Sequence, residues 1–330
     1  MKIANFIISL VCGVSLLFIS CEQEDKPVVL PPKTGSATAT VGMGETYDKQ
    51  VWFNLETGKW KDAVQKDWDL GFECSSKGFH VVLNGGKFVL AKSFSDTFLL
   101  NPTIKVPASM NWDTPNGHND STAFGLWLDT VSGNSHKQVY VVDKGELFHT
   151  AADRYWKIQL LKVTANHYSM RYCRLNNADQ HCIELPKNAT KNFVYFSFEQ
   201  GQLEIEPAAD DWHLLFTRYR DLYYEMSPIF PYLVNGILLN PNQVSCFKDS
   251  LIGFDKMDLA TAKKLPFQTE QNYIGFEWKD FDRSTNKYTV RSYYCYVLRD
   301  YKGQYFKFRF LDFYDSQGKK GYPKFEYKSL

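Results

Sequence analysis

The sequence has no excess of charge of either sign. Its 38 Lys and Arg residues nearly balance its 37 Asp and Glu residues, which leaves a formal net charge of +1. Proteins that bind nucleic acid usually carry a basic tract or a basic face, and the sequence contains no such tract. We therefore expect no nucleic-acid partner.

Motifs that carry chemistry are also missing. The sequence contains no G-x-S-x-G, no P-loop, no H-E-x-x-H and no EF-hand pattern. It has no C-x-x-C pair and no closely spaced cluster of His and Cys, so no zinc site is predicted. We therefore predict a protein that is not an enzyme and has no catalytic residues.

Long apolar runs are absent after the first 20 residues. Residues 1–20 read MKIANFIISLVCGVSLLFIS, an apolar run with the length of a signal peptide behind the single charge of Lys2. The run ends at Ser20, directly before Cys21. This arrangement predicts a lipoprotein signal peptide over residues 1–20 and acylation of Cys21, since several acyl chains anchor far better than one. The alternative is an ordinary secretory signal with an incidental cysteine.

Residues 21–39 are expected to be a lipidated flexible tether. Residues 26–39 are rich in Pro, Ser, Thr and Gly, and such a stretch cannot bury enough apolar surface to fold. Residues 22–25 read EQED. An acidic stretch directly after a lipidated cysteine resembles the export signal of some Gram-negative surface lipoproteins. We therefore expect a lipid-anchored protein of the outer membrane, at the cell surface of a Gram-negative bacterium.

What the sequence does have is an internal repeat. Residues 51–72 (VWFNLETGKWKDAVQKDWDLGF) match residues 194–216 (VYFSFEQGQLEIEPAADDWHLLF). The correspondence returns at residues 155–160 (YWKIQL) and 305–310 (YFKFRF). A repeat this long can hold its own core in each copy, which predicts tandem domains and excludes a solenoid of short units.

Strand patterns dominate both copies. The chain holds 25 Phe, 20 Tyr and 8 Trp, and aromatic residues favour strands. Residues 156–160 and 306–310 alternate apolar and polar side chains, as half-buried strands do, and long helical patterns are absent. We predict an all-β fold of two mostly antiparallel β domains, one over residues 40–187 and the other over residues 188–330.

Smaller signals predict local structure. The Asn84-Gly85-Gly86 sequence after the apolar run 79–83 predicts a hairpin with residues 88–90 as the return strand. Residues 257–264, MDLATAKK, predict a short helix with Asp255 as its cap.

Two cysteines bracket a predicted hairpin tip. Cys173 and Cys182 lie at the ends of residues 174–181, whose Asn and Asp residues favour turns. A disulfide bridge across this hairpin is one interpretation, since export makes bridges possible. Two buried thiols are the other.

The two copies resemble the HmuY-like haem-binding lipoprotein family. Each copy carries an aromatic-Phe strand, a Gly, a Trp-Asp or Trp-His pair and a Phe-ended strand, and the C-terminal copy matches from about residue 192 to residue 327. The resemblance implies HmuY-like β domains whose finger-like loops grip a porphyrin. It also implies a surface lipoprotein that captures haem for iron acquisition and passes it to an outer-membrane TonB-dependent transporter.

The resemblance places haem ligands on loops between the matched stretches. In the C-terminal copy Met257 lies in that segment and Met226 just before it, and in the N-terminal copy the segment holds His118 and His136. These four are the candidate haem-binding residues, because thioether sulfur and imidazole nitrogen bind haem iron axially. No metal other than haem iron is expected. Solvent-exposed loop histidines without a ligand role are the alternative for the histidine pair.

The sequence also departs from the family pattern. Residues 239–287 of the C-terminal copy contain no histidine, so the bis-histidine pattern of the family is absent there. A second hypothesis therefore stays open: a non-enzymatic surface adhesin, glycan-binding or receptor-partner module that has lost haem binding. The Trp68-Asp69 and Trp212-His213 pairs invite a catalytic interpretation, but a Trp in such a strand pattern more often anchors a core.

Overall fold

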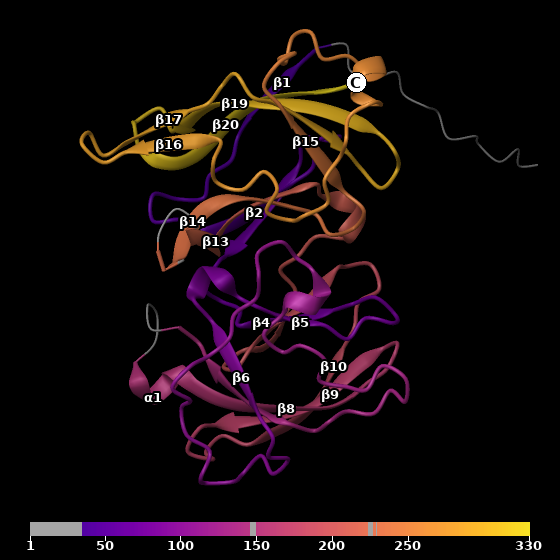
Figure 1. Ribbon diagram of the computed structural model, residues 1–330, viewed down its shortest axis with the longest axis vertical. Helices are drawn as coiled ribbons and strands as arrows, with labels where there is room; N and C mark the ends of the chain where they lie inside the picture. The colour runs from indigo at the N-terminus through magenta and orange to yellow at the C-terminus, as the bar shows by residue number, and fades with distance from the viewer. Residues whose placement is uncertain (1–34, 146–149, 224–226, 229) are drawn as a thin grey trace, which may run out of the picture. The chain divides into compact units, whose positions relative to one another are not determined.

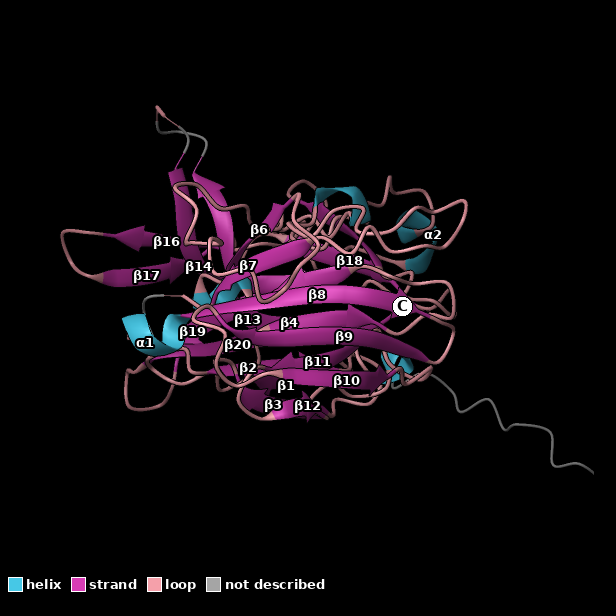
Figure 2. Ribbon diagram, turned by 90° about the horizontal axis from the view of Figure 1, so that it is seen from below, coloured by secondary structure: helices cyan, strands magenta, loops and turns pink. Residues whose placement is uncertain are grey.

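The computed structural model describes residues 35–145, 150–223, 227–228 and 230–330. The predicted signal peptide, the acylation of Cys21 and the candidate ligand Met226 lie outside the described residues. Antiparallel strands are the dominant regular structure of the described residues, so the predicted all-β fold is confirmed (Figure 1). Helices in these residues are one-turn elements, as Figure 2 shows. They are η1 (Gly85–Lys87), η2 (Asn119–Ser121), α1 (Ala151–Arg154), η3 (Ala209–Asp211) and α2 (Leu259–Ala262).

The first lobe consists of two facing antiparallel sheets. The outer sheet has the strand order β10-β9-β8-β7-β6 and the inner sheet the order β12-β11-β4-β5. The outer strands are β6 (Leu90–Phe94), β7 (Val139–Asp143), β8 (Tyr155–Val163), β9 (His167–Arg174) and β10 (His181–Pro186). The inner strands are β4 (Leu70–Glu73), β5 (Val81–Leu83), β11 (Phe193–Ser197) and β12 (Gly201–Leu203).

The second lobe repeats this arrangement. Its outer sheet has the order β1-β20-β19-β18-β15 and its inner sheet the order β14-β13-β2-β3. The outer strands are β1 (Ala37–Thr40), β15 (Ser245–Asp249), β18 (Cys295–Arg299), β19 (Tyr305–Tyr314) and β20 (Lys320–Ser329). The inner strands are β2 (Lys49–Phe53), β3 (Trp60–Val64), β13 (Leu214–Tyr223) and β14 (Phe230–Leu239). A separate hairpin joins β16 (Lys279–Asp282) to β17 (Lys287–Val290).

Each inner sheet combines strands from both copies of the sequence repeat. Phe72 of β4 lies opposite Val194 of β11, and the matching residue Phe216 of β13 lies opposite Val51 of β2. The two pairings are reciprocal, because each copy gives its first strand to the other. This differs from the sequential arrangement expected above, in which residues 40–187 and 188–330 would form separate sheets. Local strand patterns fix where strands lie but not which copy supplies the partner.

The Trp68-Asp69 and Trp212-His213 pairs also connect the two copies, through backbone hydrogen bonds. The N–H of Asp69 donates to the carbonyl of Phe196, and the N–H of His213 donates to that of Phe53, both at 2.8 Å. Trp68 and Trp212 are buried, as a structural role requires. Each pair therefore fastens its own copy to the first strand of the other copy.

Three apolar clusters hold the sheets together. One fills the space between the two sheets of the first lobe, and a second does the same in the second lobe. The third contains Trp52, Trp68, Tyr195 and Trp212 and packs between the two inner sheets. Aromatic side chains bury large areas and interlock edge to face, as the 4.7 Å separation of the Trp68 and Tyr195 rings shows.

Several local expectations need correction. Residues 37–39 of the predicted tether belong to β1, where backbone pairing with β20 supplies order that composition alone does not. The turn at Asn84 does not close a hairpin, because η1 carries the chain from β5 in the inner sheet to β6 in the outer sheet. The helix over residues 259–262 is capped by Asp258, which accepts from the N–H of Thr261 at 2.8 Å, and not by Asp255.

Cys173 and Cys182 are free thiols in the structure. Cys173 is buried and Cys182 is exposed. Cys182 lies opposite Arg171 in the β9–β10 register, so the two cysteines are diagonal neighbours across the hairpin. Diagonal positions are about 7–8 Å apart, wider than the usual Cα separation of a disulfide. This strand register therefore does not place Cys173 and Cys182 close enough for the disulfide bridge considered above. The alternative of two buried thiols is correct only for Cys173.

Candidate functional site

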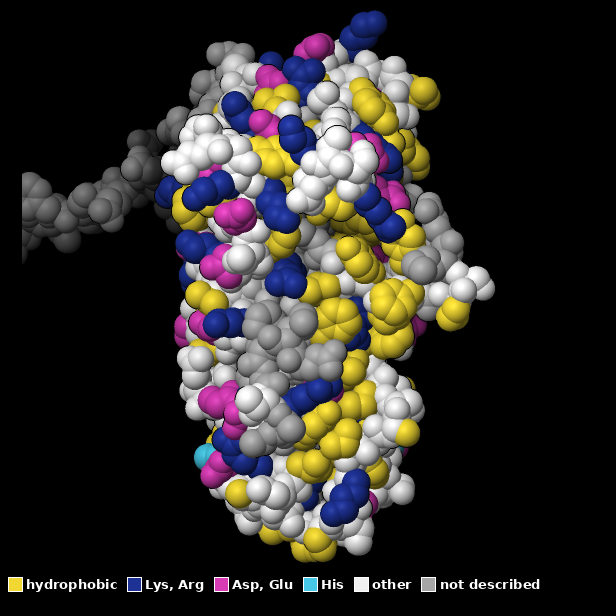
Figure 3. Space-filling model, turned by 90° about the vertical axis from the view of Figure 1, so that its left-hand side faces the viewer, with side chains coloured by type: hydrophobic (Ala, Val, Ile, Leu, Met, Phe, Trp, Pro, Cys, Tyr) yellow, Lys and Arg dark blue, Asp and Glu magenta, His cyan; other side chains and the backbone are white. Residues whose placement is uncertain are grey.

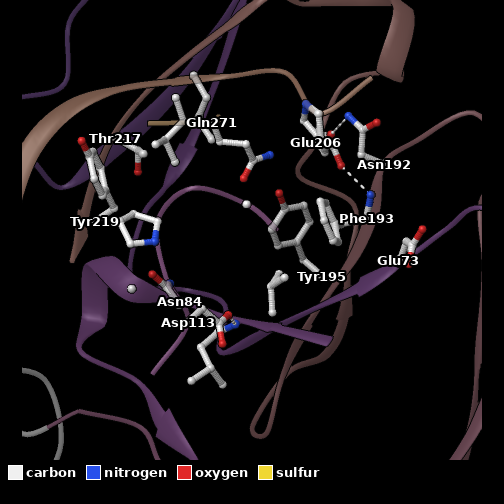
Figure 4. Close-up of a pocket in the computed structure, with 18 of the residues that line it drawn as sticks. Glu73, Asn84, Asp113, Asn192, Phe193, Tyr195, Glu206, Thr217, Tyr219 and Gln271 are labelled. Atoms are coloured by element: carbon white, nitrogen blue, oxygen red, sulfur yellow. Dashed lines mark hydrogen bonds between the residues drawn. The ribbon is translucent and has the colours of Figure 1, made fainter. Parts of the chain in front are cut away.

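A cleft of about 1290 Å³ opens where the two inner sheets face each other. Its walls come from both copies of the repeat, with Trp68 and Leu83 on one side and Leu215 and Thr217 on the other. A concave space with aromatic walls and convergent polar groups is the usual form of a ligand site, and this cleft is somewhat larger than the common range. We therefore take this cleft as the candidate functional site (Figure 4).

The loop of residues 112–122 forms one wall of the cleft. Asp113 holds it in place, because its carboxylate accepts from the backbone N–H groups of Leu83 at 2.6 Å and Ala123 at 2.7 Å. Burial raises the pKa of Asp113 to about 7, against the pull of these two hydrogen bonds. His118 lies on the same loop, is exposed and lines the cleft.

The opposite wall contains a second buried carboxyl group. Glu206 accepts from the backbone N–H of Phe193 and from Nδ2 of Asn192, both at 2.9 Å, as the dashed lines of Figure 4 show. Burial raises its pKa to about 7. In Figure 4 Gln271 lies across the open space from Asp113. The two acidic groups of the cleft, Asp113 and Glu206, thus lie on different walls, and the pKa of each is raised.

Asn84 and Gln50 line the cleft and belong to a network of amide side chains. Gln65 donates through Nε2 to Oδ1 of Asn84 at 2.7 Å, and Asn84 donates through Nδ2 to the carbonyl of Trp68 at 2.8 Å. The indole N–H of Trp68 donates to Oε1 of Gln50 at 3.2 Å. These hydrogen bonds hold Trp68 in place within the fold. This agrees with the interpretation of Trp68 as a core anchor and not as part of a catalytic pair.

The three described candidate ligands lie in different places. His118 lines the cleft, whereas His136 and Met257 do not. His136 is exposed in the loop before β7. Met257 is 1 % exposed and packs in an apolar cluster of the second lobe with Phe254 and Val297. The ligand roles of these residues stay predictions.

The lining residues fit a haem with one protein ligand. Among them His118 supplies an imidazole and none supplies a thioether. Trp112, Phe193 and Tyr195 line the same space and offer flat apolar surfaces to a porphyrin. The described residues contain no group of three or more His, Cys, Asp or Glu placed to hold a metal ion. Nor do they contain a helix long and apolar enough to cross a membrane.

Sequence patterns missed the polar residues of the cleft. Asp113, Glu206 and Arg220 line it from three distant stretches of the chain, and none belongs to a recognisable motif. The one sequence feature that could have indicated these cleft residues was the aromatic-acidic pair Trp112-Asp113 in a segment that otherwise has a loop-like composition. The role of this pair becomes visible only in the structure, where β13 packs beside η1.

The fold and the cleft define a two-lobed, all-β protein with a ligand-sized space between its inner sheets. Within it, residues 241–327, which run from the end of β14 to β20, match the sequence model of the family described as HmuY protein. The resemblance to that family is therefore confirmed for this stretch.

Solved structures with similarity to this chain include two that are described as HmuY-like or as an HmuY analogue. Apo PinO from Porphyromonas gingivitis is 10% identical with a TM-score of 0.30, and the match covers 90% of this chain and 98% of that one. The apo HmuY analogue of Tannerella forsythia is 10% identical with a TM-score of 0.26, covering 89% and 95%. A chain from Bacteroides vulgatus described as HmuY-like and heme binding is 11% identical with a TM-score of 0.24, covering 88% and 90%. No curated protein matches this chain.

Proposed function

We propose that this chain is a cell-surface lipoprotein of the HmuY type that binds haem for iron acquisition. The observation that carries the proposal is the cleft of about 1290 Å³ with His118 on its wall. The family match at residues 241–327 supports it. The protein would act as a binding protein and not as an enzyme.

The anchoring and the partner belong to the same proposal. Acylated Cys21 would hold the chain in the outer membrane of a Gram-negative bacterium, with residues 22–36 between Cys21 and β1 in the sequence. A TonB-dependent transporter in the same membrane would receive the haem. Haem in a cleft between the inner sheets would be reachable from outside, since residues 117–120 of the loop that carries His118 are exposed.

Haemin titration of the mature protein tests the proposal. We expect a saturable Soret change with one haem per chain, and we expect His118→Ala to lose or strongly weaken it, because the imidazole is the axial ligand. His181→Ala is the matched control, since His181 is an exposed histidine of β10 outside the cleft. A Soret change that disappears with His136→Ala instead would move the site out of the cleft. The absence of any saturable change would refute haem binding.

One observation favours a second candidate function, a receptor-partner or adhesin module without haem. Phe230 and Tyr232 of β14 are each 53% exposed, and Phe281 of β16 is also exposed. Figure 3 shows hydrophobic side chains gathered on the side where these strands end in Figure 1. Exposed aromatic groups of this kind are common in protein and sugar contacts. This function would be supported if the unmodified protein does not bind haemin but binds a protein or a glycan of a cell surface, and if the Phe230→Ser variant loses that binding.

A further inference from the structure

Arg220 is buried in the cleft with two nitrogen atoms that lack hydrogen-bond partners. The residue lies on β13, lines the cleft and is 4% exposed. Its Nε and Nη1 are buried and have no partner among the described residues. A buried N–H without an acceptor is costly, and a buried charge costs more. Such a group calls for an explanation, and a water, an ion or a ligand in the cleft would supply the missing acceptors.

Two aromatic rings hold the guanidinium in position. Its central carbon lies 4.2 Å from the ring centroid of Phe88 and 5.2 Å from that of Trp112. Cation–π contacts stabilise the charge through the ring faces, but they accept no hydrogen bonds in the plane of the guanidinium. The planar fork of N–H groups is therefore fixed in orientation and left without acceptors.

The carboxylates near Arg220 are occupied by other partners. Both oxygens of Asp113 already accept backbone N–H groups of the cleft wall. Asp143 forms a two-bond pair with Arg154, from Nε at 2.6 Å and from Nη2 at 2.7 Å. Both act on Arg220 only through the electrostatic field. The fold thus places negative charge near Arg220 without giving it a hydrogen-bonded counter-ion.

A second donor without a partner lines the same cleft. Nε2 of Gln50 is buried and has no hydrogen-bond partner, while its Oε1 accepts from Trp68. Arg220 and Gln50 both present N–H groups. A ligand that completes the cleft must therefore bring oxygen acceptors, and a planar carboxylate matches a guanidinium fork best.

We infer that Arg220 binds the carboxylate of the cleft ligand, whose apolar body lies along the aromatic walls. The inference rests on the proposed function for the identity of the ligand: if the ligand is haem, the carboxylate that Arg220 binds is a propionate. This contact adds a second point of attachment at β13, separate from the proposed iron ligand His118 on the loop of residues 112–122.

Iron-free porphyrins separate the carboxylate contact from the iron contact. Protoporphyrin IX carries both propionates but offers no axial position to His118, and its dimethyl ester keeps the ring and loses the charges. We expect the unmodified protein to bind the diacid at least about tenfold more tightly than the ester, as a charge-assisted bidentate pair implies. Arg220→Met should remove this preference. Arg283→Gln, which removes an exposed arginine charge from the β16–β17 turn, should keep it.

Thermal melting of the same variants excludes a merely structural role. If Arg220 is a ligand-binding charge without a partner, Arg220→Met should leave the melting temperature of the free protein unchanged or raised, because an unpaired buried charge disappears. A large drop would mean that Arg220 is paired within the fold, and it would overturn the inference. Arg220→Lys keeps the charge and loses the fork, and we expect it to lose most of the diacid preference.

The outcomes distinguish this inference from the proposed function. Haemin binding that needs His118, together with an unchanged diacid preference in Arg220→Met, would refute the carboxylate site alone. A diacid preference that needs Arg220, without a Soret change dependent on His118, would refute haem ligation alone. Failure of the unmodified protein to bind either porphyrin would refute both.

Discussion

Nζ of Lys87 lies 2.5 Å from Oδ1 of Asp69, and both side chains are almost completely buried. The other carboxylate oxygen of Asp69 accepts from the backbone N–H of Phe198 at 2.9 Å. Asp69 thus joins η1 of the first copy to the end of β11 from the second copy. The aspartate of the Trp-Asp pair is a structural ion-pair partner at the exchange point of the two copies.

Removing one member of this pair should destabilise the fold. Asp69→Asn leaves the Lys87 ammonium buried without a counter-charge, which typically costs about 3–5 kcal/mol. Urea unfolding of the purified protein measures the loss. The double variant Asp69→Asn with Lys87→Met should recover much of it, because no buried charge remains. A double variant as unstable as the single one would show that the hydrogen bond to Phe198 carries the stability instead.

His213 occupies the matching position in the second copy. Its Nδ1 accepts from the backbone N–H of Leu55 at 2.9 Å, and its Nε2 lies 3.7 Å from Oδ2 of Asp300. Because Nδ1 accepts, the ring carries its proton on Nε2, facing the carboxylate. We expect His213→Ala to lower the free energy of unfolding by about 1–3 kcal/mol, since a buried N–H loses its acceptor. His213→Asn, which can still accept, should restore part of that loss in the same measurement.

Lys279 should make stability depend on pH above neutrality. Burial lowers its pKa from 10.5 to about 7, while Nζ donates to the carbonyl of Asn235 at 2.7 Å and lies 4.3 Å from the ring centroid of Trp278. Between pH 7 and 10.5 the unfolded chain binds this proton and the folded chain does not, so stability rises with pH across that window. The rise is at most about 5 kcal/mol. Lys279→Met should remove this contribution from the slope, and a slope unchanged in the variant would show that Lys279 stays charged.

The two cleft carboxyl groups should have the opposite effect at lower pH. Burial raises the pKa of Asp113 from 3.8 and that of Glu206 from 4.5, each to about 7. A raised folded pKa favours folding below the unfolded pKa, and that contribution is lost as pH rises from about 4 to about 7. Glu206→Gln should flatten this decline when unfolding is followed by urea titration at several pH values. A decline as steep as in the unmodified protein would assign it to other groups.

The sequence was informative about strands and uninformative about their partners. The alternation in residues 156–160 and 306–310 predicted β8 and β19, because successive side chains of a strand lie on opposite faces of the sheet. The strands are not half-buried as expected, since the polar residues Lys157, Gln159 and Lys307 are buried too. The same local pattern cannot tell whether Val51 pairs within its own copy or with Phe216 of the other. Arg220 and Trp112 lie far apart in sequence and meet only in the folded structure. Local sequence patterns therefore could not predict the cleft, although they did single out His118, which lines it.

The exchange of strands makes a specific prediction about the two halves of the chain. Residues 40–187 lack β11, which pairs with β4, and residues 188–330 lack β2, which pairs with β13. Each half alone would expose an unpaired edge of its inner sheet together with the apolar cluster around Trp52 and Trp212. We expect neither half to unfold cooperatively on its own, and we expect the intact chain to show a single transition. Circular dichroism during thermal unfolding of the three purified proteins measures this, with an equimolar mixture of the halves as a further sample. If residues 188–330 alone gave a sharp transition like that of the intact chain, the inner sheets would not need the exchange for stability.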